Sequence, residues 1–165
     1  MEKQVYLKEN IDKFMACKKF AVAGVSSKSY KTGSSIFREL KKKGYDIVPV
    51  SPNLDYFEEF RCYRSVSELP DDVEALIVAT KPEQGISVIR DAEDKGIKNI
   101  FVQLGAHSNE IIEYGSRNEL NLICKQCIFM FAQPTGIHKF HEKLAKLFGA
   151  YPKQRPEKSI TVAGN

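Results

Sequence analysis

The stretch Phe20-Ala-Val-Ala-Gly-Val25, followed by Ser26-Ser-Lys-Ser-Tyr-Lys-Thr-Gly-Ser-Ser35, decides the fold of this chain. The first part is a short apolar run typical of a buried strand, and an amphipathic helix is expected from about Ser35 to Lys43, ended by Gly44. The loop between them carries small residues and two lysines. Exposed backbone N–H groups and the positive end of a helix dipole favour an anion at such a place. The stretch therefore predicts a strand, a phosphate-binding loop and a helix.

Strand and helix patterns alternate through the rest of the chain. Further apolar runs stand at 46–50, 73–79, 99–103 and 121–124. Pro82 is expected in the first turn of one intervening helix, and the Ser108 hydroxyl is expected to cap another. Because these strands are continuous apolar runs, helices should cover both faces of the sheet. The sequence predicts an α/β fold with a doubly wound, mostly parallel, Rossmann-like sheet of about five strands.

The length of 165 residues suits one domain, expected over 1–150. An N-terminal helix is expected within 1–17 and a last amphipathic helix after Pro134-Thr-Gly136, while 151–165 reads as a flexible tail. No apolar stretch approaches the ~20 residues of a membrane span, and the first residues lack the pattern of a secretion signal. These features predict a cytoplasmic protein that does not bind a membrane.

The charge of the chain argues against a nucleic-acid partner. Lys and Arg number 25 against 21 Asp and Glu, a net charge of +4, which is a mild excess and not a dense basic stripe. Lys28 is expected to be a solvated surface charge, whereas Lys31 lies within the proposed phosphate-binding loop. The pattern favours a small-molecule nucleotide as the partner.

In open α/β sheets, ligands bind outside the carboxyl ends of the strands. The four tips at this edge are 24–34, 51–53, 80–82 and 103–105, and all are small, polar or cationic. None of the four carries a carboxylate, so a general base or a magnesium site is not expected at the tips. The predicted binding residues are Gly24, Val25, Ser26, Ser27, Lys31, Thr32, Gly33, Ser34, Ser51, Pro52, Asn53, Thr80, Lys81, Pro82, Gln103, Leu104 and Gly105.

A nicotinamide-dependent oxidoreductase is the alternative that this fold class raises. Its dinucleotide site uses three closely spaced glycines and an acidic residue after the second strand. Here Gly24 and Gly33 lie too far apart, and the second strand is followed by 51–53, with Asp55 further on. The long loop with its lysines instead suits a ligand that bears several phosphates.

The order and spacing of four segments resemble the small stand-alone CoA-binding proteins related to the CoA-binding domain of succinyl-CoA synthetase α subunits. The resemblance runs from about residue 18 to 149. The matching segments are Val22-Ala-Gly-Val-Ser-Ser27 with Lys31-Thr-Gly33, Gly44-Tyr-Asp-Ile-Val-Pro-Val-Ser-Pro-Asn53, Thr80-Lys-Pro-Glu83, and Gly96-Ile-Lys-Asn-Ile-Phe-Val-Gln-Leu-Gly105.

The resemblance implies coenzyme A, or an acyl-CoA, as the ligand. It implies that the phosphates lie over Ser26, Ser27, Lys31 and Gly33. It also implies that Asn53 and 80–82 frame the nucleotide and that 103–105 approach the pantetheine arm. The phosphohistidine loop and the grasp domain of the ligases are not found in the sequence, so no catalytic residue is predicted. A Gly33→Asp variant is expected to weaken binding while the fold persists.

The cysteines are expected to be reduced thiols. Cys124 and Cys127 have the spacing of half a metal site, and a set with His138 and His141 is conceivable, but the spacing is wrong for a zinc finger. No metal is therefore predicted. A mixed disulfide between Cys127 and the CoA thiol is a second hypothesis.

Two functions follow from the resemblance. The first is a non-catalytic carrier, sensor or regulator that binds CoA or acyl-CoA. The second is a CoA-binding subunit that works with a separate catalytic partner. A homodimer or a partner enzyme is the expected form of association.

Overall fold

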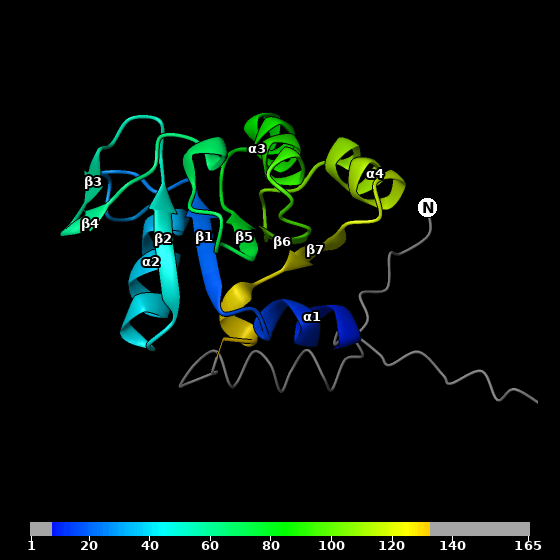
Figure 1. Ribbon diagram of the computed structural model, residues 1–165, viewed down its shortest axis with the longest axis horizontal. Helices are drawn as coiled ribbons and strands as arrows, with labels where there is room; N and C mark the ends of the chain where they lie inside the picture. Colours follow the sequence, from blue (N-terminus) through cyan, green and yellow to red (C-terminus); the bar gives the residue numbers. More distant parts are fainter. Residues whose placement is uncertain (1–7, 133–165) are drawn as a thin grey trace, which may run out of the picture.

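The computed structural model describes residues 8–132. Within this range a five-stranded, fully parallel sheet is flanked by four α-helices, and a separate two-stranded hairpin stands beside it (Figure 1). The helix expected after Pro134-Thr-Gly136 and the tail 151–165 lie outside the described residues. The α-helices are α1 Lys8–Met15, α2 Thr32–Lys42, α3 Pro82–Asp94 and α4 Asn109–Arg117.

The strand order of the main sheet is β2-β1-β5-β6-β7, with all neighbours parallel. The chain runs outward from β1 to β2 and then returns to the other side of β1, so the strand order reverses between β1 and β5. The strands are β1 Lys19–Ala23, β2 Asp46–Val50, β5 Ala75–Val78, β6 Asn99–Gln103 and β7 Asn121–Gln126. The doubly wound, Rossmann-like α/β fold predicted from the sequence is confirmed.

Two apolar layers cover the two faces of the sheet. On one face α1 and α2 bury Phe14, Ile36 and Phe37 against the strands, and on the other α3 and α4 bury Ile89 and Ile111. Figure 1 shows α3 and α4 above the sheet, α1 below it and α2 at the lower left beside β2. Because both faces are covered, β5 is buried along its whole length, which explains its continuous apolar sequence.

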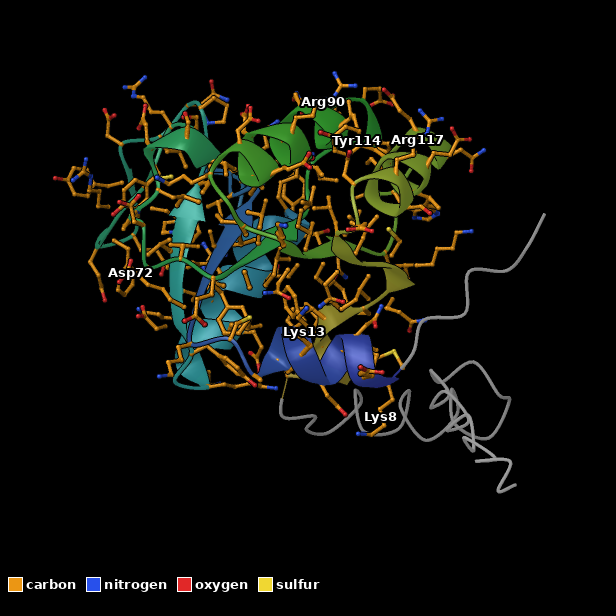
Figure 2. All side chains as sticks on the ribbon, turned by 45° about the vertical axis from the view of Figure 1, so that its right-hand side comes forward. Lys8, Lys13, Asp72, Arg90, Tyr114 and Arg117 are labelled. Carbon is orange, nitrogen blue, oxygen red and sulfur yellow. The ribbon has the colours of Figure 1, made fainter. Side chains whose placement is uncertain are left out.

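The two helices of the upper layer are also joined by polar contacts. The Tyr114 hydroxyl on α4 donates a hydrogen bond to a Glu93 carboxylate oxygen on α3 at 2.5 Å, and the Arg90 guanidinium lies over the Tyr114 ring. Figure 2 shows Arg90 and Tyr114 close together on this surface. The hydrogen bond to Glu93 raises the pKa of Tyr114, because it favours the protonated phenol.

Several element boundaries differ from the sequence prediction. The helix expected from Ser35 begins at Thr32, the strand expected over 73–79 is β5, and the last strand extends to Gln126. The segment that follows β2 contains the hairpin of β3 Tyr56–Phe57 and β4 Phe60–Arg61, and the 3-10 helix η1 Val66–Glu68. A second 3-10 helix, η2, spans Ile128–Met130.

All four cysteines are thiols, with Cys62 and Cys124 buried. Burial raises the pKa of the Cys62 thiol, which favours its protonated form. Between residues 8 and 132, every helix is too short or too polar to traverse a lipid bilayer.

Candidate functional site

Two adjoining cavities open at the carboxyl edge of the sheet, at the point where the strand order reverses. Their volumes are about 520 Å³ and about 330 Å³. Both are lined by Gly24, Lys31, Thr80 and Lys81, so the tips of β1 and β5 form a wall that the two cavities share. Ligands of α/β sheets bind at this kind of position, and the size range is that of small-molecule sites.

The predicted residues divide between the two cavities according to their strand. The larger cavity is bounded by Ser51, Pro52 and Asn53 after β2 and also by Val25 and Ser26. The smaller cavity is bounded by Gln103, Leu104 and Gly105 after β6 and also by Thr32 and Pro82. The four tips predicted from the sequence are therefore brought together along one edge.

Three predicted residues, Ser27, Gly33 and Ser34, line neither cavity. Ser27 is exposed on the loop, and Gly33 and Ser34 are buried in the first turn of α2. Contact between these three residues and a ligand stays a prediction.

Gly24 and Gly33 hold the loop close to its neighbours. Gly24 has a φ of +105°, and a Cβ there would lie 2.5 Å from the Ala79 carbonyl oxygen. A Cβ on Gly33 would lie 2.4 Å from the carbonyl oxygen of Gly24. Only glycine fits at either place, because a Cβ cannot approach a backbone so closely. The added Cβ of a Gly33→Asp variant would force the backbone there to shift, so the variant would disturb the shape of the loop as well as any ligand contact, and the persistence of its fold stays a prediction.

Ser34 fastens the start of the loop. Its hydroxyl donates to the Ser26 carbonyl oxygen at 2.8 Å and accepts from the Ser26 N–H at 3.0 Å. Ser34 is fully buried, so its hydroxyl serves these two bonds. The sequence places Ser34 among ligand-facing serines, whereas the structure gives it a part in shaping the loop.

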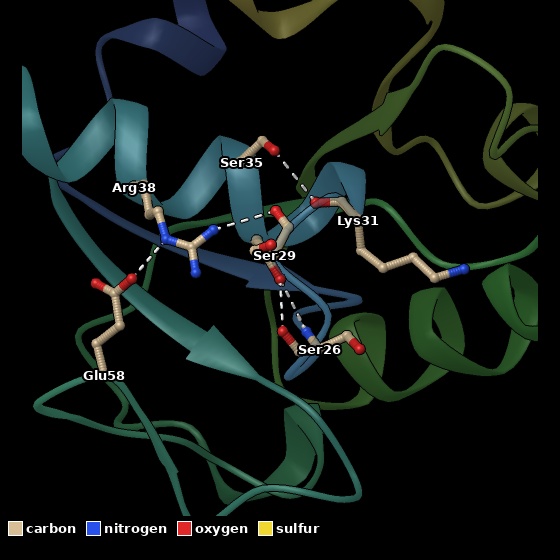
Figure 3. A network of polar contacts seen from close by, with 7 residues as sticks. Ser26, Ser29, Lys31, Ser35, Arg38 and Glu58 are labelled. Atoms are coloured by element: carbon tan, nitrogen blue, oxygen red, sulfur yellow. Dashed lines mark hydrogen bonds and ion pairs between the residues drawn. The ribbon is translucent and has the colours of Figure 1, made fainter.

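Two helices begin at the shared wall without a side-chain cap. Lys31 precedes the first turn of α2 and Lys81 precedes that of α3, both with extended backbone and neither with a capping hydrogen bond from its side chain. Helix N-termini carry partial positive charge, and two lysine side chains add full charges beside them. In Figure 3 the Lys31 side chain extends away from the loop. This arrangement suits an anion that carries more than one phosphate.

The Thr80 hydroxyl adds a second polar feature to the same wall. Its Oγ1 atom is buried and has no hydrogen-bond partner among the described residues. Buried hydroxyls in native structures are nearly always hydrogen-bonded, so an unpartnered one beside a cavity indicates a place for a ligand or a water molecule. Small residues, two cations and an unpartnered hydroxyl together fit a diphosphate group.

Sequence reasoning missed one face of α3 that lines the larger cavity. Gln84, Ser87 and Asp91 follow one another at helical spacing, so they share a face of the helix. That spacing is visible in the sequence and could have identified this polar face of the helix. Asp91 places a carboxylate on the wall, although the four strand tips themselves carry none.

Arg64 and Ser65 also line the larger cavity and were not predicted. They reach it because Tyr63 pairs beside β2, where the Ser51 N–H donates to the Tyr63 carbonyl oxygen at 2.8 Å. The Arg64 guanidinium pairs with Asp55 at 2.7 Å. A non-local pairing of this kind leaves no local signal in the sequence.

Gln103 anchors the chain that follows β7. Its side-chain carbonyl accepts from the Ile128 N–H at 3.1 Å, and its amide donates to the Cys127 sulfur at 3.4 Å. Cys127 therefore lies beside the tip expected to meet the pantetheine arm, and its mixed disulfide with CoA stays a hypothesis. In residues 8–132, no three His, Cys, Asp or Glu side chains are grouped to hold a metal, and His138 and His141 lie outside that range.

The model of the CoA binding domain family matches residues 18–133, most of the chain. The chain belongs to the CoA-binding domain family. This finding confirms the resemblance to small CoA-binding proteins seen in the sequence. The matched segment begins just before β1 and runs past η2, so it contains both cavities.

The curated relatives of this family member include much longer enzymes. It is 35% identical over 95 residues to acetate–CoA ligase (ADP-forming) II of Archaeoglobus fulgidus, which is 56% of this chain and 14% of the ligase. It is 27% identical over 114 residues to the α subunit of acetate–CoA ligase (ADP-forming) II of Pyrococcus furiosus, 68% of this chain and 25% of the subunit. The chain thus spans a quarter or less of the length of these ligases.

A solved structure of a smaller protein also matches. A conserved hypothetical protein from Pyrococcus furiosus is 36% identical, with a TM-score of 0.65. The alignment covers 67% of this chain and 96% of that protein.

Proposed function

We propose that this protein binds coenzyme A or an acyl-CoA along the carboxyl edge of its sheet and acts as a non-catalytic carrier, sensor or regulator. The observation that carries the proposal is the wall shared by the two cavities. There the N-termini of α2 and α3, with Lys31 and Lys81, form a cationic centre. Membership of the CoA-binding domain family supports CoA as the ligand.

The order of the site matches the order of the parts of CoA. The diphosphate lies between the nucleotide and the pantetheine arm of the molecule, and the cationic wall lies between the two cavities. We assign the nucleotide to the larger cavity beside Asn53, and the pantetheine arm to the smaller cavity beside 103–105. Lys31, Lys81 and the Thr80 hydroxyl would then face the phosphates.

The composition of the cavity walls supports binding over catalysis. Among the described residues of the two walls, Asp91 is the one carboxylate, neither a histidine nor a cysteine takes part, and we assign the two shared lysines, Lys31 and Lys81, to the phosphates. General acid–base catalysis requires a positioned titratable group within reach of the reacting atoms. Asp91 lies in the larger cavity, which we assign to the nucleotide and not to the thiol end.

A second candidate function is that of a CoA-binding subunit that works with a separate catalytic partner. The match to a ligase α subunit favours it, because there a chain of this family is part of a larger enzyme. The match that covers 96% of a small solved protein favours the stand-alone carrier instead. Affinity capture with the tagged protein, with and without CoA, separates the two, since a subunit should retain a ligase-like partner.

A thermal-shift panel with CoA, acetyl-CoA, NAD, NADP and ATP tests the proposal. A ligand at 100 times its dissociation constant stabilises the folded state by ~2.7 kcal/mol. CoA or acetyl-CoA should raise the melting temperature by several degrees, and NAD should leave it unchanged. A shift with NAD and none with CoA would overturn the proposal in favour of a dinucleotide-dependent enzyme.

A further inference from the structure

The middle of the phosphate-binding loop is exposed to solvent, yet it is held from outside the loop. The two ends of the loop are fixed by local hydrogen bonds. The Ser26 backbone is hydrogen-bonded to the Ser34 hydroxyl, and the Lys31 N–H donates to the Lys28 carbonyl oxygen. Between these ends, the Arg38 Nη1 donates to the Ser29 carbonyl oxygen at 3.2 Å. Arg38 thus supplies a hydrogen bond at the centre of the loop (Figure 3).

Arg38 is itself fixed by the β3–β4 hairpin. Its Nε donates to a Glu58 carboxylate oxygen at 2.5 Å, and its guanidinium carbon lies 4.9 Å from the centre of the Phe57 ring. Phe57 is buried against Phe37 of α2, so the ring on which the guanidinium packs is held in place. A guanidinium is planar and donates in several fixed directions, which lets one side chain hold the loop and the hairpin together.

Glu58 occupies a backbone conformation that favours glycine. Its φ is +55°, in the left-handed region that non-glycine residues seldom adopt. A glycine would meet the demand of the turn without strain. The carboxylate that pairs with Arg38 is therefore what the Glu58 side chain adds at this place.

We infer that Arg38 and Glu58 are positioning residues that hold the phosphate-binding loop in its binding-competent shape before a ligand arrives. The inference rests on the proposed function, because it assigns the loop to the phosphates of CoA. Neither residue lines a cavity, so both act through the Ser29 carbonyl and not by touching the ligand. A loop that is already ordered loses less conformational entropy on binding, and its ligand binds more tightly.

The direction in which Glu58→Gly changes CoA affinity separates this role from a simple charge effect. Glu58→Gly removes a negative charge near a site for a polyanion, so electrostatics alone would tighten the binding of CoA. It also frees Arg38, so the loss of loop order would weaken binding. Because glycine relieves the strain at φ +55°, the variant should still fold at least as well as the parent.

The experiment combines calorimetric titration with CoA and hydrogen–deuterium exchange of the ligand-free protein. Glu58→Gly should weaken CoA binding by roughly threefold to tenfold, the effect of leaving one or two side chains or a short loop unordered. It should also speed amide exchange in residues 27–30 and leave the melting temperature unlowered. Arg38→Lys, which keeps the charge but not the planar fork, should show the same two effects.

Glu113→Gln is the matched control. Glu113 pairs with Arg117 at 3.3 Å on the exposed face of α4, and it lines neither cavity (Figure 2 shows Arg117). This variant removes an exposed carboxylate from an Arg–Glu pair and should change neither CoA affinity nor exchange in the loop.

The outcomes distinguish the two levels of the proposal. Wild-type protein that binds CoA while Glu58→Gly binds it equally or more tightly would overturn the positioning role and leave the proposed function standing. Wild-type protein that fails to bind CoA would overturn the proposed function. In that case amide exchange in the loop of ligand-free Glu58→Gly still tests the positioning role. An exchange rate equal to that of the wild type would show that the two residues do not order the loop.

Discussion

The helices of this sheet begin in two different ways. α4 begins after Ser108, whose hydroxyl accepts a hydrogen bond from the Ile111 N–H at 3.2 Å. α2 and α3 begin after Lys31 and Lys81, and neither lysine side chain makes a capping bond. A lysine has no acceptor to offer to the first N–H groups of a helix, whereas serine is among the favoured capping residues.

The difference follows the position of each helix relative to the cavities. The two uncapped helices start at the wall that the cavities share, and Ser108 lines neither cavity. A capped terminus is satisfied by the protein itself, while a cationic, uncapped terminus has the donors and the charge to receive an anion. Under the proposed function, the contrast separates a helix start that stabilises the fold from two that would receive the phosphates of the ligand.

The largest expected effect comes from moving the first turn of α2. Gly33→Ala places a Cβ 2.4 Å from the Gly24 carbonyl oxygen, so α2 and the end of β1 must separate. We expect a loss of about 3 kcal/mol in the free energy of unfolding, at the upper end for overpacked sites, together with weaker CoA binding. Urea denaturation and titration with CoA measure the two effects.

Gly44→Ala is the control for the loss of a glycine. Gly44 has a φ of +87°, and no atom lies within 4 Å of its missing Cβ, so only backbone strain should appear. The expected cost is about 1 kcal/mol, with no change in CoA affinity. Equal stability of Gly33→Ala and the wild-type protein would show that the fold does not require the close packing of α2 against the end of β1.

The next effect tests the cations at the uncapped helix starts. Lys31→Ala and Lys81→Ala should each weaken CoA binding by about tenfold, since each would remove a charge-assisted contact that we propose to a phosphate. The ligand-free proteins should unfold as the wild type does. The affinity of the wild type should fall with added salt more steeply than that of either variant.

Lys28→Ala provides the matched comparison within the same loop. Lys28 is exposed and lines neither cavity, so its loss should change CoA affinity by less than about twofold, in keeping with a screened surface charge. An effect of Lys28→Ala as large as that of Lys31→Ala would mean that net charge, and not position at the wall, decides binding.

The capped helix should behave in the opposite way. Ser108→Ala removes the acceptor for the Ile111 N–H and should cost about 1 kcal/mol of stability. CoA affinity should not change, because Ser108 lies outside both cavities. A loss of CoA affinity without a loss of stability would reverse the division proposed for the helix starts.

The smallest effect concerns the opposite end of α3. Lys95, at its C-terminus, donates to Asp71 at 2.9 Å, and this hydrogen bond lowers the pKa of the Asp71 carboxyl. A lowered pKa in the folded state stabilises the protein above the ordinary pKa of aspartate and is lost as the pH falls through the lowered value. Asp71→Asn should therefore lower stability slightly at pH 7 and leave it unchanged at strongly acidic pH. Urea denaturation of both proteins at pH 7 and at strongly acidic pH measures this difference in stability. An equal difference at the two pH values would contradict a stabilising contact between Lys95 and ionised Asp71.

Much of the fold could be predicted because its strands carry a strong local signal. The run at 20–25 and those at 46–50 and 99–103 are apolar enough to identify buried parallel strands, and the Ser108 cap was read correctly. The hairpin was missed because β3 and β4 have only two residues each, too few to show any periodicity. The contact of the hairpin with Arg38 could not be inferred either, because it depends on the turn that places Glu58 beside Arg38.

The candidate site was predictable only as a set of strand tips. Sequence spacing identified the tips that line the cavities, because the carboxyl ends of parallel strands meet at one edge. It could not show that Gly33 faces the Gly24 carbonyl, since that contact depends on how α2 sits against β1. It also could not place Arg64, which arrives through the pairing of Tyr63 with the chain after β2.

A titration of the isotopically labelled protein with CoA, followed through its backbone amide signals, tests the central claim most directly. Binding should shift the amides of 24–34, 80–84 and 103–105, at the two uncapped helix starts and the β6 tip, while those of 108–111 at the capped start of α4 stay in place. Signals that shift around α4, or none that shift at the starts of α2 and α3, would contradict the assignment of this edge to the phosphates of CoA.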